Sequence, residues 1–94
     1  YTIADCKFCQ AAKGALSHLR IPFKNIDVEE NEHMGEYLER HLETEFYPII
    51  YLKKSEEEYI YILSETNLEK LNHIRIFNTI EEALEILLQY YYEL

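Results

Sequence analysis

Short extended segments alternate with amphipathic helical segments along this chain of 94 residues, and this order constrains the fold more than any other feature. Apolar side chains recur at helical spacing in residues 6–20, and Pro22 ends that helix. A second helix is predicted over residues 29–43, with Asn31 as its N-cap. Each helix has one apolar face, so both are expected to pack against a sheet.

Strand patterns fill the intervals between these helices. They occur in residues 1–3, which resemble the end of a strand, and in residues 23–28, 49–52 and 59–63. The polar residues 53–57 predict a hairpin between the last two strands, and residues 67–73 predict the start of a third helix. Because helices connect the first strands, the chain is expected to form an α/β fold with a mixed four-stranded sheet. The strand-like start also leads us to expect a natural chain that begins before Tyr1.

The C-terminal segment predicts an additional helix. Thr79 is its candidate N-cap, and Glu82 three residues later completes a capping box. Most of its apolar residues form one stripe (Ile80, Ala83, Leu84, Leu87, Leu88 and Tyr91), whereas Ile86, Tyr90 and Leu94 lie off it. We expect residues 79–94 to pack as a helix on a domain formed by residues 1–78. The apolar residues off the stripe leave a homodimer or partner surface as the alternative.

The charge of the chain narrows the classes of partner. Nine Lys and Arg residues stand against 18 Asp and Glu residues, which gives a formal net charge of −9. Nucleic acids and anionic membrane surfaces need clustered cations, so neither is an expected partner. No apolar stretch approaches the roughly 20 residues of a membrane span.

The two cysteines, Cys6 and Cys9, lie at the predicted start of the first helix. The first turn of a helix presents unsatisfied N–H groups and the positive end of the helix dipole, and both favour a thiolate. Lys7 adds positive charge beside Cys6 and Asp5 opposes it, so we expect a lowered Cys6 pKa that Asp5 tempers. Cys9 is placed to resolve a mixed disulfide formed by Cys6. A lone C-x-x-C pair fits a reducing compartment, and a cytoplasmic location is expected.

Two other interpretations of the cysteines are open. The pair is half of a zinc site if two further ligands come from the histidines, which are His18, His33, His41 and His73. None of these forms a close H-x-x-x-H pair, so no metal site is expected. In the other interpretation both thiols are inert, buried side chains.

In its motifs the chain resembles a glutaredoxin, within the thioredoxin-fold superfamily, over about residues 1–71. Three motifs carry the resemblance: Cys6-Lys-Phe-Cys9 in place of the family's C-P-Y-C, Ile26-Asp-Val28 as the second-strand motif, and Glu45-Phe-Tyr-Pro48 in place of T-V-P and the residue before it. The resemblance implies a thioredoxin-like fold and a thiol–disulfide oxidoreductase that acts on protein or glutathione mixed disulfides. It also implies glutathione as the reductant, without a tightly bound cofactor.

The resemblance assigns roles to residues near the pair. In the family the proline of T-V-P is cis, faces the active cysteine and presents backbone to an extended thiol substrate. This implies a substrate-binding role for Tyr47 and Pro48. Phe8 takes the aromatic place inside the cysteine motif, and Lys7 beside it is a further candidate contact.

Several positions that hold glutathione in the family are altered here. Ile3 or Ala4 stands where the family has a lysine, Glu45 where it has a polar or basic residue, and Ser64-Glu65 where it has Gly-Gly. A glutathione carboxylate then meets fewer cations and one more anion, at a cost of about 1 kcal/mol for each change. Thr66 and Asn67 are the remaining candidates, through their hydroxyl, amide and helix N-terminal N–H groups, and Arg40 is a candidate replacement cation.

The expected function is therefore a dithiol disulfide reductase in which Cys6 attacks, Cys9 resolves and Pro48 positions the substrate backbone. A disulfide reductase is the alternative to glutathione as electron donor. Two other functions stay open: a thioredoxin-fold binding module with little intrinsic activity, and a carrier of an iron–sulfur cluster shared with glutathione. The altered glutathione positions disfavour the carrier.

Overall fold

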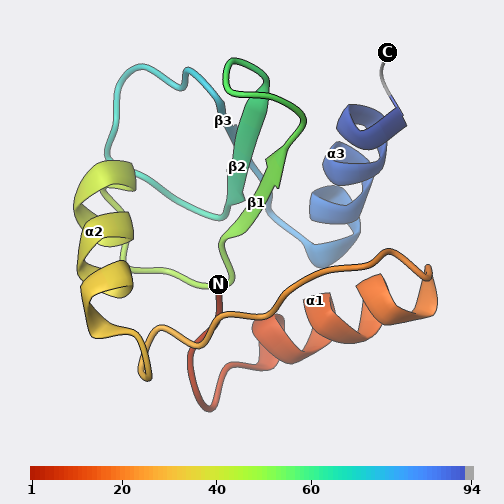
Figure 1. The fold of residues 1–94 in the computed structure, drawn as a ribbon, viewed down its shortest axis with the longest axis horizontal. Coiled ribbons are helices and arrows are strands. Elements are labelled where there is room, and N and C mark those ends of the chain that lie inside the picture. Colours follow the sequence, from red (N-terminus) through yellow and green to blue (C-terminus); the bar gives the residue numbers. More distant parts are fainter. Residues whose placement is uncertain (93–94) are drawn as a thin grey trace.

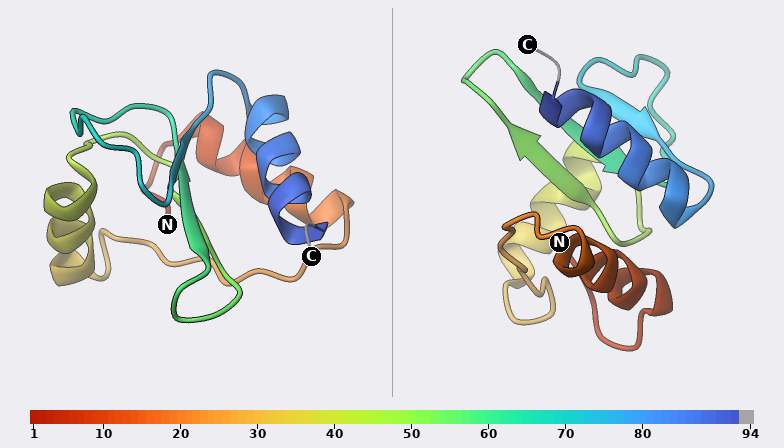
Figure 2. Two further views of the ribbon diagram at one scale, coloured as in Figure 1. Left: turned by 90° about the horizontal axis from the view of Figure 1, so that it is seen from above. Right: turned by 90° about the vertical axis from the view of Figure 1, so that its right-hand side faces the viewer.

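The computed structural model describes residues 1–92, which form a sheet with helices on both of its faces (Figure 1). The elements in chain order are α1 (Lys7–His18), α2 (Glu32–Leu42), β1 (Ile50–Lys53), β2 (Tyr59–Leu63), β3 (Ile74–Ile76) and α3 (Ile80–Tyr92). Viewed along the sheet, α2 covers one face, and α1 and α3 cover the other (Figure 2). This arrangement is the α/β, thioredoxin-like architecture that the sequence predicts.

The sheet has the order β1-β2-β3 and mixed strand directions. β1 and β2 form the predicted antiparallel hairpin, in which Ile50 lies opposite Ile62. The polar turn between them is held by an ion pair from Lys53 to Glu56 at 2.7 Å. β3 then pairs with β2 in parallel, with Ile74 opposite Tyr61. The predicted hairpin is confirmed, and β2 coincides with the predicted segment 59–63.

The first two predicted strands are present only as isolated pairing. Thr2 and Asp27 form a parallel bridge, in which the Thr2 N–H donates to Ile26 O at 2.9 Å. On its other side, Tyr1 exchanges two backbone hydrogen bonds with Ile49, of 2.8 and 3.1 Å. The predicted strand over residues 23–28 is therefore wrong as a regular element. Among the described residues, backbone pairing in this segment is confined to residues 26–28, which contact Thr2.

The predicted third helix over residues 67–73 does not form. Residues 64–73 are an irregular connection that is tied to the end of α2, where the Asn67 N–H donates to Glu43 O at 3.0 Å. The chain then turns at His73, which has a left-handed φ of 63°, and enters β3. Ile74 and Ile76 flank an exposed Arg75, which is the alternation of a short strand. Pairing with β2 stabilises this strand.

The core has two parts, one on each face of the sheet, because side chains alternate along β2. On the face of α1 and α3 the buried cluster consists of Leu16, Ile60, Ile62, Phe77, Ala83 and Leu87. On the face of α2 it consists of Val28, Leu38, Leu42, Ile49, Leu63 and Ile74. The sheet therefore holds α1, with its cysteines, and α2 on opposite sides.

The predicted C-terminal helix is confirmed as α3. The Glu82 N–H donates to Thr79 Oγ1 at 3.2 Å, which is the N-cap bond expected from the sequence. The Glu82 carboxylate accepts from the Asn78 N–H at 3.1 Å rather than from Thr79, so only half of the capping box forms. Tyr91 and Tyr92 are exposed at the end of α3. Leu94 lies outside the described residues, and the partner surface stays a prediction.

Within residues 1–92, no helix has both the length and the apolar character that crossing a membrane requires.

Replacing Leu87 with alanine tests whether α3 is part of the core. Leu87 is 4% exposed and contacts the cluster shared by α1 and β2. We expect Leu87→Ala to lower the free energy of unfolding by about 2–5 kcal/mol in urea denaturation. The matched control is Glu85→Ala on the exposed face of the same helix, for which a change within about 0.5 kcal/mol is expected. Equal small effects would show that α3 does not stabilise the domain.

Candidate redox site

Cys6 is the N-cap residue of α1. Its backbone is extended, with φ −112° and ψ 105°, and its Sγ accepts a hydrogen bond from the Cys9 N–H at 3.1 Å. Asp5 before it has a left-handed φ of 54°, a conformation that Asp tolerates better than most residues. The sulfur thus takes the place of a capping oxygen, where N–H groups and the helix dipole favour negative charge.

The two cysteines are linked by a disulfide, so the structure shows the oxidised state of the pair. Their Cα atoms are 5.2 Å apart, which is the approach of two residues less than one helical turn apart. Cys9 is only 1% exposed, whereas Cys6 is half-buried. A substrate sulfur can therefore reach Cys6 directly, and Cys9 faces the interior.

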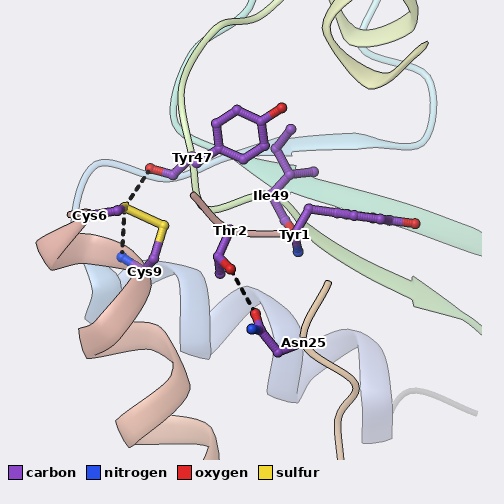
Figure 3. Close-up of a disulfide and its surroundings, with 7 residues drawn as sticks. All are labelled: Tyr1, Thr2, Cys6, Cys9, Asn25, Tyr47 and Ile49. Carbon is purple, nitrogen blue, oxygen red and sulfur yellow. Dashed lines mark hydrogen bonds between the residues drawn. A yellow bond between two sulfur atoms is a disulfide. The ribbon is translucent and has the colours of Figure 1, made fainter. Parts of the chain in front are cut away.

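The segment before β1 passes directly beside this disulfide (Figure 3). The carbonyl oxygen of Tyr47 lies 3.8 Å from Cys6 Sγ. The Tyr47–Pro48 peptide bond is cis, as the family resemblance implies, and Pro48 is buried. Residues 41 positions apart in the chain are thus brought together at one site, with the backbone of Tyr47 turned toward the sulfur.

The side chain of Tyr47 contacts Glu39, a residue of α2 that was not predicted from the sequence. The Tyr47 phenol donates to Glu39 Oε2 at 3.3 Å. Burial, with the nearby Glu39 carboxylate as a smaller cause, raises the pKa of Tyr47 to about 12. Glu39 is one of many glutamates in the chain, and only the folded structure shows that it faces Tyr47.

Lys7 and Phe8 begin α1, next to the disulfide, and both are exposed. The Phe8 side chain is 59% exposed, which is a high value for a large aromatic residue. An aromatic ring in this position is available to contact a bound peptide. The substrate-binding roles of Lys7 and Phe8 stay predictions.

The hydrogen bonds of Thr66 and Asn67 connect these residues to the end of α2 and to Leu68, and none of them reaches the disulfide. The Thr66 hydroxyl donates to Leu42 O and accepts from the Leu68 N–H, so it is already used within the fold. Since no helix begins at residue 67, the helix N-terminal N–H groups expected there are missing. The prediction that these two residues offer a helix N-terminus to a carboxylate is therefore wrong.

Thr66 and Asn67 instead line a separate cavity of about 460 Å³ beside the segment that leads to Pro48. Four glutamates share this cavity with one cation, Arg40; they are Glu39, Glu43, Glu45 and Glu65. Neither cysteine lines it. An anionic ligand placed there would meet mainly negative charge.

The histidines give the cysteine pair no metal partners in the structure. Among residues 1–92, no group of three or more His, Cys, Asp or Glu side chains is arranged to hold a metal ion.

Thiol–disulfide exchange is the chemistry that this geometry supports, on a fold of the thioredoxin type. The model of one protein family, described as Glutaredoxin, matches residues 1–56, which is more than half of the chain. The chain therefore belongs to the glutaredoxin family, whose general activity is thiol–disulfide oxidoreduction. Comparisons with curated proteins and with solved structures give no match.

The burial of Tyr47, with its contact to Glu39 as a smaller cause, predicts an unusual titration. The folded-state pKa of about 12 lies above the ordinary value of 10.0 for a tyrosine, so the phenol stays protonated between these values. The raised pKa of Tyr47 adds to the free energy of unfolding. This contribution is full below pH 10 and is lost as the pH rises through about 12. The phenolate absorbance of wild type minus Tyr47→Phe should show a midpoint near 12. Glu39→Gln should lower this midpoint by the smaller part of the shift. A wild-type midpoint near 10 would contradict the burial of the phenol, and an unchanged midpoint in Glu39→Gln would contradict the contact.

Proposed function

We propose that the protein is a dithiol reductase of disulfides in other proteins, with Cys6 as the nucleophile and Cys9 as the resolving residue. One observation carries this proposal: Cys6 is accessible and caps α1 through its sulfur, whereas Cys9 is buried behind it. The helix start favours the Cys6 thiolate, which is the attacking species in disulfide exchange.

In the first step the reduced Cys6 thiolate attacks one sulfur of the substrate disulfide. The substrate S–S bond breaks, a Cys6–substrate bond forms, and the other substrate sulfur leaves as a thiolate that takes up a proton. In the second step the Cys9 thiolate attacks Cys6 Sγ. The mixed disulfide breaks, the second substrate thiolate leaves, and the Cys6–Cys9 disulfide of this structure forms. The substrate has gained two electrons, and the pair has lost two.

The segment at Tyr47 and Pro48 supplies the surface on which the substrate backbone lies. The Tyr47 carbonyl points to the sulfur at which exchange takes place, so an extended substrate chain can bind alongside it. Phe8, two residues after Cys6 in the first turn of α1, offers an exposed ring for an apolar substrate side chain. Together they favour a peptide rather than a single small anion as the substrate.

The charges beside the segment that leads to Pro48 support one kind of electron donor over another. Two molecules of glutathione, or the dithiol of a disulfide reductase, can return two electrons to the Cys6–Cys9 disulfide. Glutathione carries two carboxylates at neutral pH, and Glu45 and its neighbouring glutamates disfavour them near the Pro48 segment. Glutathione is therefore a weak donor here, and a reductase dithiol is the better one.

Cysteine variants test the order of the two steps. Cys6→Ser should reduce disulfide reductase activity to background with any donor, because the nucleophile is removed. Cys9→Ser should lose activity toward protein disulfides and accumulate a mixed disulfide through Cys6, which intact-mass spectrometry detects. Asp5→Asn serves as a control that retains both thiols. If Cys6→Ser remains active, or if the trapped substrate is attached to Cys9, the proposed roles are wrong.

A charge reversal tests the donor. Glu45→Lys replaces an exposed anion beside the Pro48 segment with a cation. We expect the glutathione-dependent rate to rise about fivefold at low salt, and the gain to shrink as ionic strength increases. The rate with a thioredoxin reductase as donor should change less. Glu85→Lys, the same reversal on α3, controls for net charge, and an equal gain in both variants would refute a local effect.

A second candidate function is a binding module that uses α3 to dock a partner or a second copy of the chain. The observation in its favour is the exposure of Tyr91 and Tyr92, which are 45% and 70% accessible at the end of α3. Light scattering of wild type and of Tyr91→Ser with Tyr92→Ser separates these cases. A monomer in both samples removes the homodimer.

A further inference from the structure

Tyr47 lies between the redox pair and α2. Its backbone carbonyl is 3.8 Å from Cys6 Sγ, at the start of α1, and its ring points away from the disulfide (Figure 3). On that far side the phenol donates a hydrogen bond to Glu39 Oε2 of α2, at 3.3 Å. One residue thus links the reacting sulfur to a helix on the opposite face of the sheet.

The chain after Tyr47 is firmly fixed. Pro48 and Ile49 are both buried, and Ile49 exchanges backbone hydrogen bonds with Tyr1. A residue that precedes proline is also confined to extended conformations, because the proline ring clashes with its backbone in the helical conformation. The C-terminal side of Tyr47 therefore depends on the start of β1 and needs no further support.

The chain before Tyr47 is held less firmly. Glu45 and Phe46 are exposed, and the Phe46 side chain is 51% accessible. Two hydrogen bonds connect this stretch to the end of α2: the Thr44 N–H donates to Glu39 O, and the Phe46 N–H donates to Thr44 Oγ1, both at 3.2 Å. Glu39 therefore accepts from this connection twice, through its carbonyl at Thr44 and through its carboxylate at Tyr47.

The Glu39 carboxylate is suited to hold the phenol. Among residues 1–92 it forms no ion pair, and its Oε2 accepts the hydrogen bond of Tyr47. A hydrogen bond from a neutral phenol to a carboxylate is charge-assisted and stronger than one between two neutral groups. Burial, with Glu39 as a smaller cause, raises the pKa of Tyr47 to about 12, so the phenol keeps the proton that it donates well above neutral pH.

From this geometry we infer that Glu39 is a positioning residue for thiol–disulfide exchange and that it acts through Tyr47. By holding the phenol, Glu39 fixes where the Tyr47 carbonyl stands beside Cys6, and therefore where an extended substrate chain lies during exchange. Among residues 1–92 no hydrogen bond joins Glu39 to either cysteine, so its effect on the reaction passes through Tyr47. The inference rests on the proposed function, because it assigns a role in the same reaction.

The alignment matters most for a substrate that has a peptide backbone. An extended chain can lie alongside the Tyr47 carbonyl, so a shift of that carbonyl displaces the substrate sulfur from Cys6 Sγ. Displacements of about 1 Å are enough to slow a reaction strongly, because the reacting atoms must approach closely. A small disulfide without a backbone does not use this surface, and its exchange with Cys6 should be insensitive to Glu39.

Single-turnover oxidation of the reduced protein tests this role without an electron donor. The two oxidants are a neutral peptide disulfide and 2-hydroxyethyl disulfide, which has no peptide backbone. We expect Glu39→Ala to lower the rate constant with the peptide about fivefold, as for the loss of one hydrogen bond, and to leave the rate with the small disulfide unchanged. Glu39→Gln keeps an acceptor oxygen and should recover at least half of the lost rate. Glu36→Ala, which removes an exposed charge from the same helix, should match wild type with both oxidants.

A double-mutant cycle shows whether Glu39 acts through Tyr47. Tyr47→Phe removes the same hydrogen bond, so its effect should equal that of Glu39→Ala, and the double variant should be no slower than either single variant. Multiplied effects in the double variant would overturn the inference. A loss in Glu39→Ala that is equal for both oxidants would also overturn it, because the substrate backbone would then play no part.

The outcomes separate this role from the proposed function. If wild type reacts with the peptide and Cys6→Ser does not, but Glu39→Ala reacts as fast as wild type, the reductase stands and the positioning role is wrong. If wild type reacts with neither oxidant, both are wrong. An equal loss in Glu36→Ala, or no recovery in Glu39→Gln, would refute the hydrogen bond to Tyr47 as the cause.

Discussion

The hydrogen bond from the Cys9 N–H to Cys6 Sγ joins the chemistry of this protein to its fold. A helix N-terminus needs an acceptor, and here the acceptor is the sulfur that also carries the reaction. The position of that sulfur is fixed because α1 is itself fixed. Leu16, on the buried face of α1, packs in the core cluster against the sheet. The site is therefore a property of the packed helix rather than of the two cysteines alone.

Packing explains which parts of the site could be read from the sequence. The C-x-x-C spacing and the helical pattern after it place Cys6 at a helix start, because both signals are local. The approach of Tyr47 and Pro48 to Cys6 spans about 40 residues, and only the family resemblance implied it. The contact of Glu39 with Tyr47 had no sequence signal, since it depends on how α2 packs.

The fold shows the same division. The β1–β2 hairpin and α3 were predictable from alternation, a polar turn and a capping residue at Thr79. Residues 67–73 have apolar residues at helical spacing, yet they form no helix. They belong to the irregular connection that leads from the end of β2 to β3, which pairs with β2 along its other edge. The strand expected over residues 23–28 is reduced to a single bridge for a related reason, since strand formation needs a neighbour and only residues 26–28 pair with one, at Thr2.

The cysteine pair and the separate, charged cavity lined by Thr66 and Asn67 impose different demands on a ligand. Disulfide exchange needs an accessible sulfur and room for the substrate backbone, which Cys6 and Tyr47 provide without any cation. Tight capture of glutathione would additionally need partners for two carboxylates, and Arg40 is the single cation among the residues lining that cavity. Thiol chemistry can therefore persist where glutathione affinity is low. This separation is the basis for proposing a protein dithiol, rather than glutathione, as the electron donor.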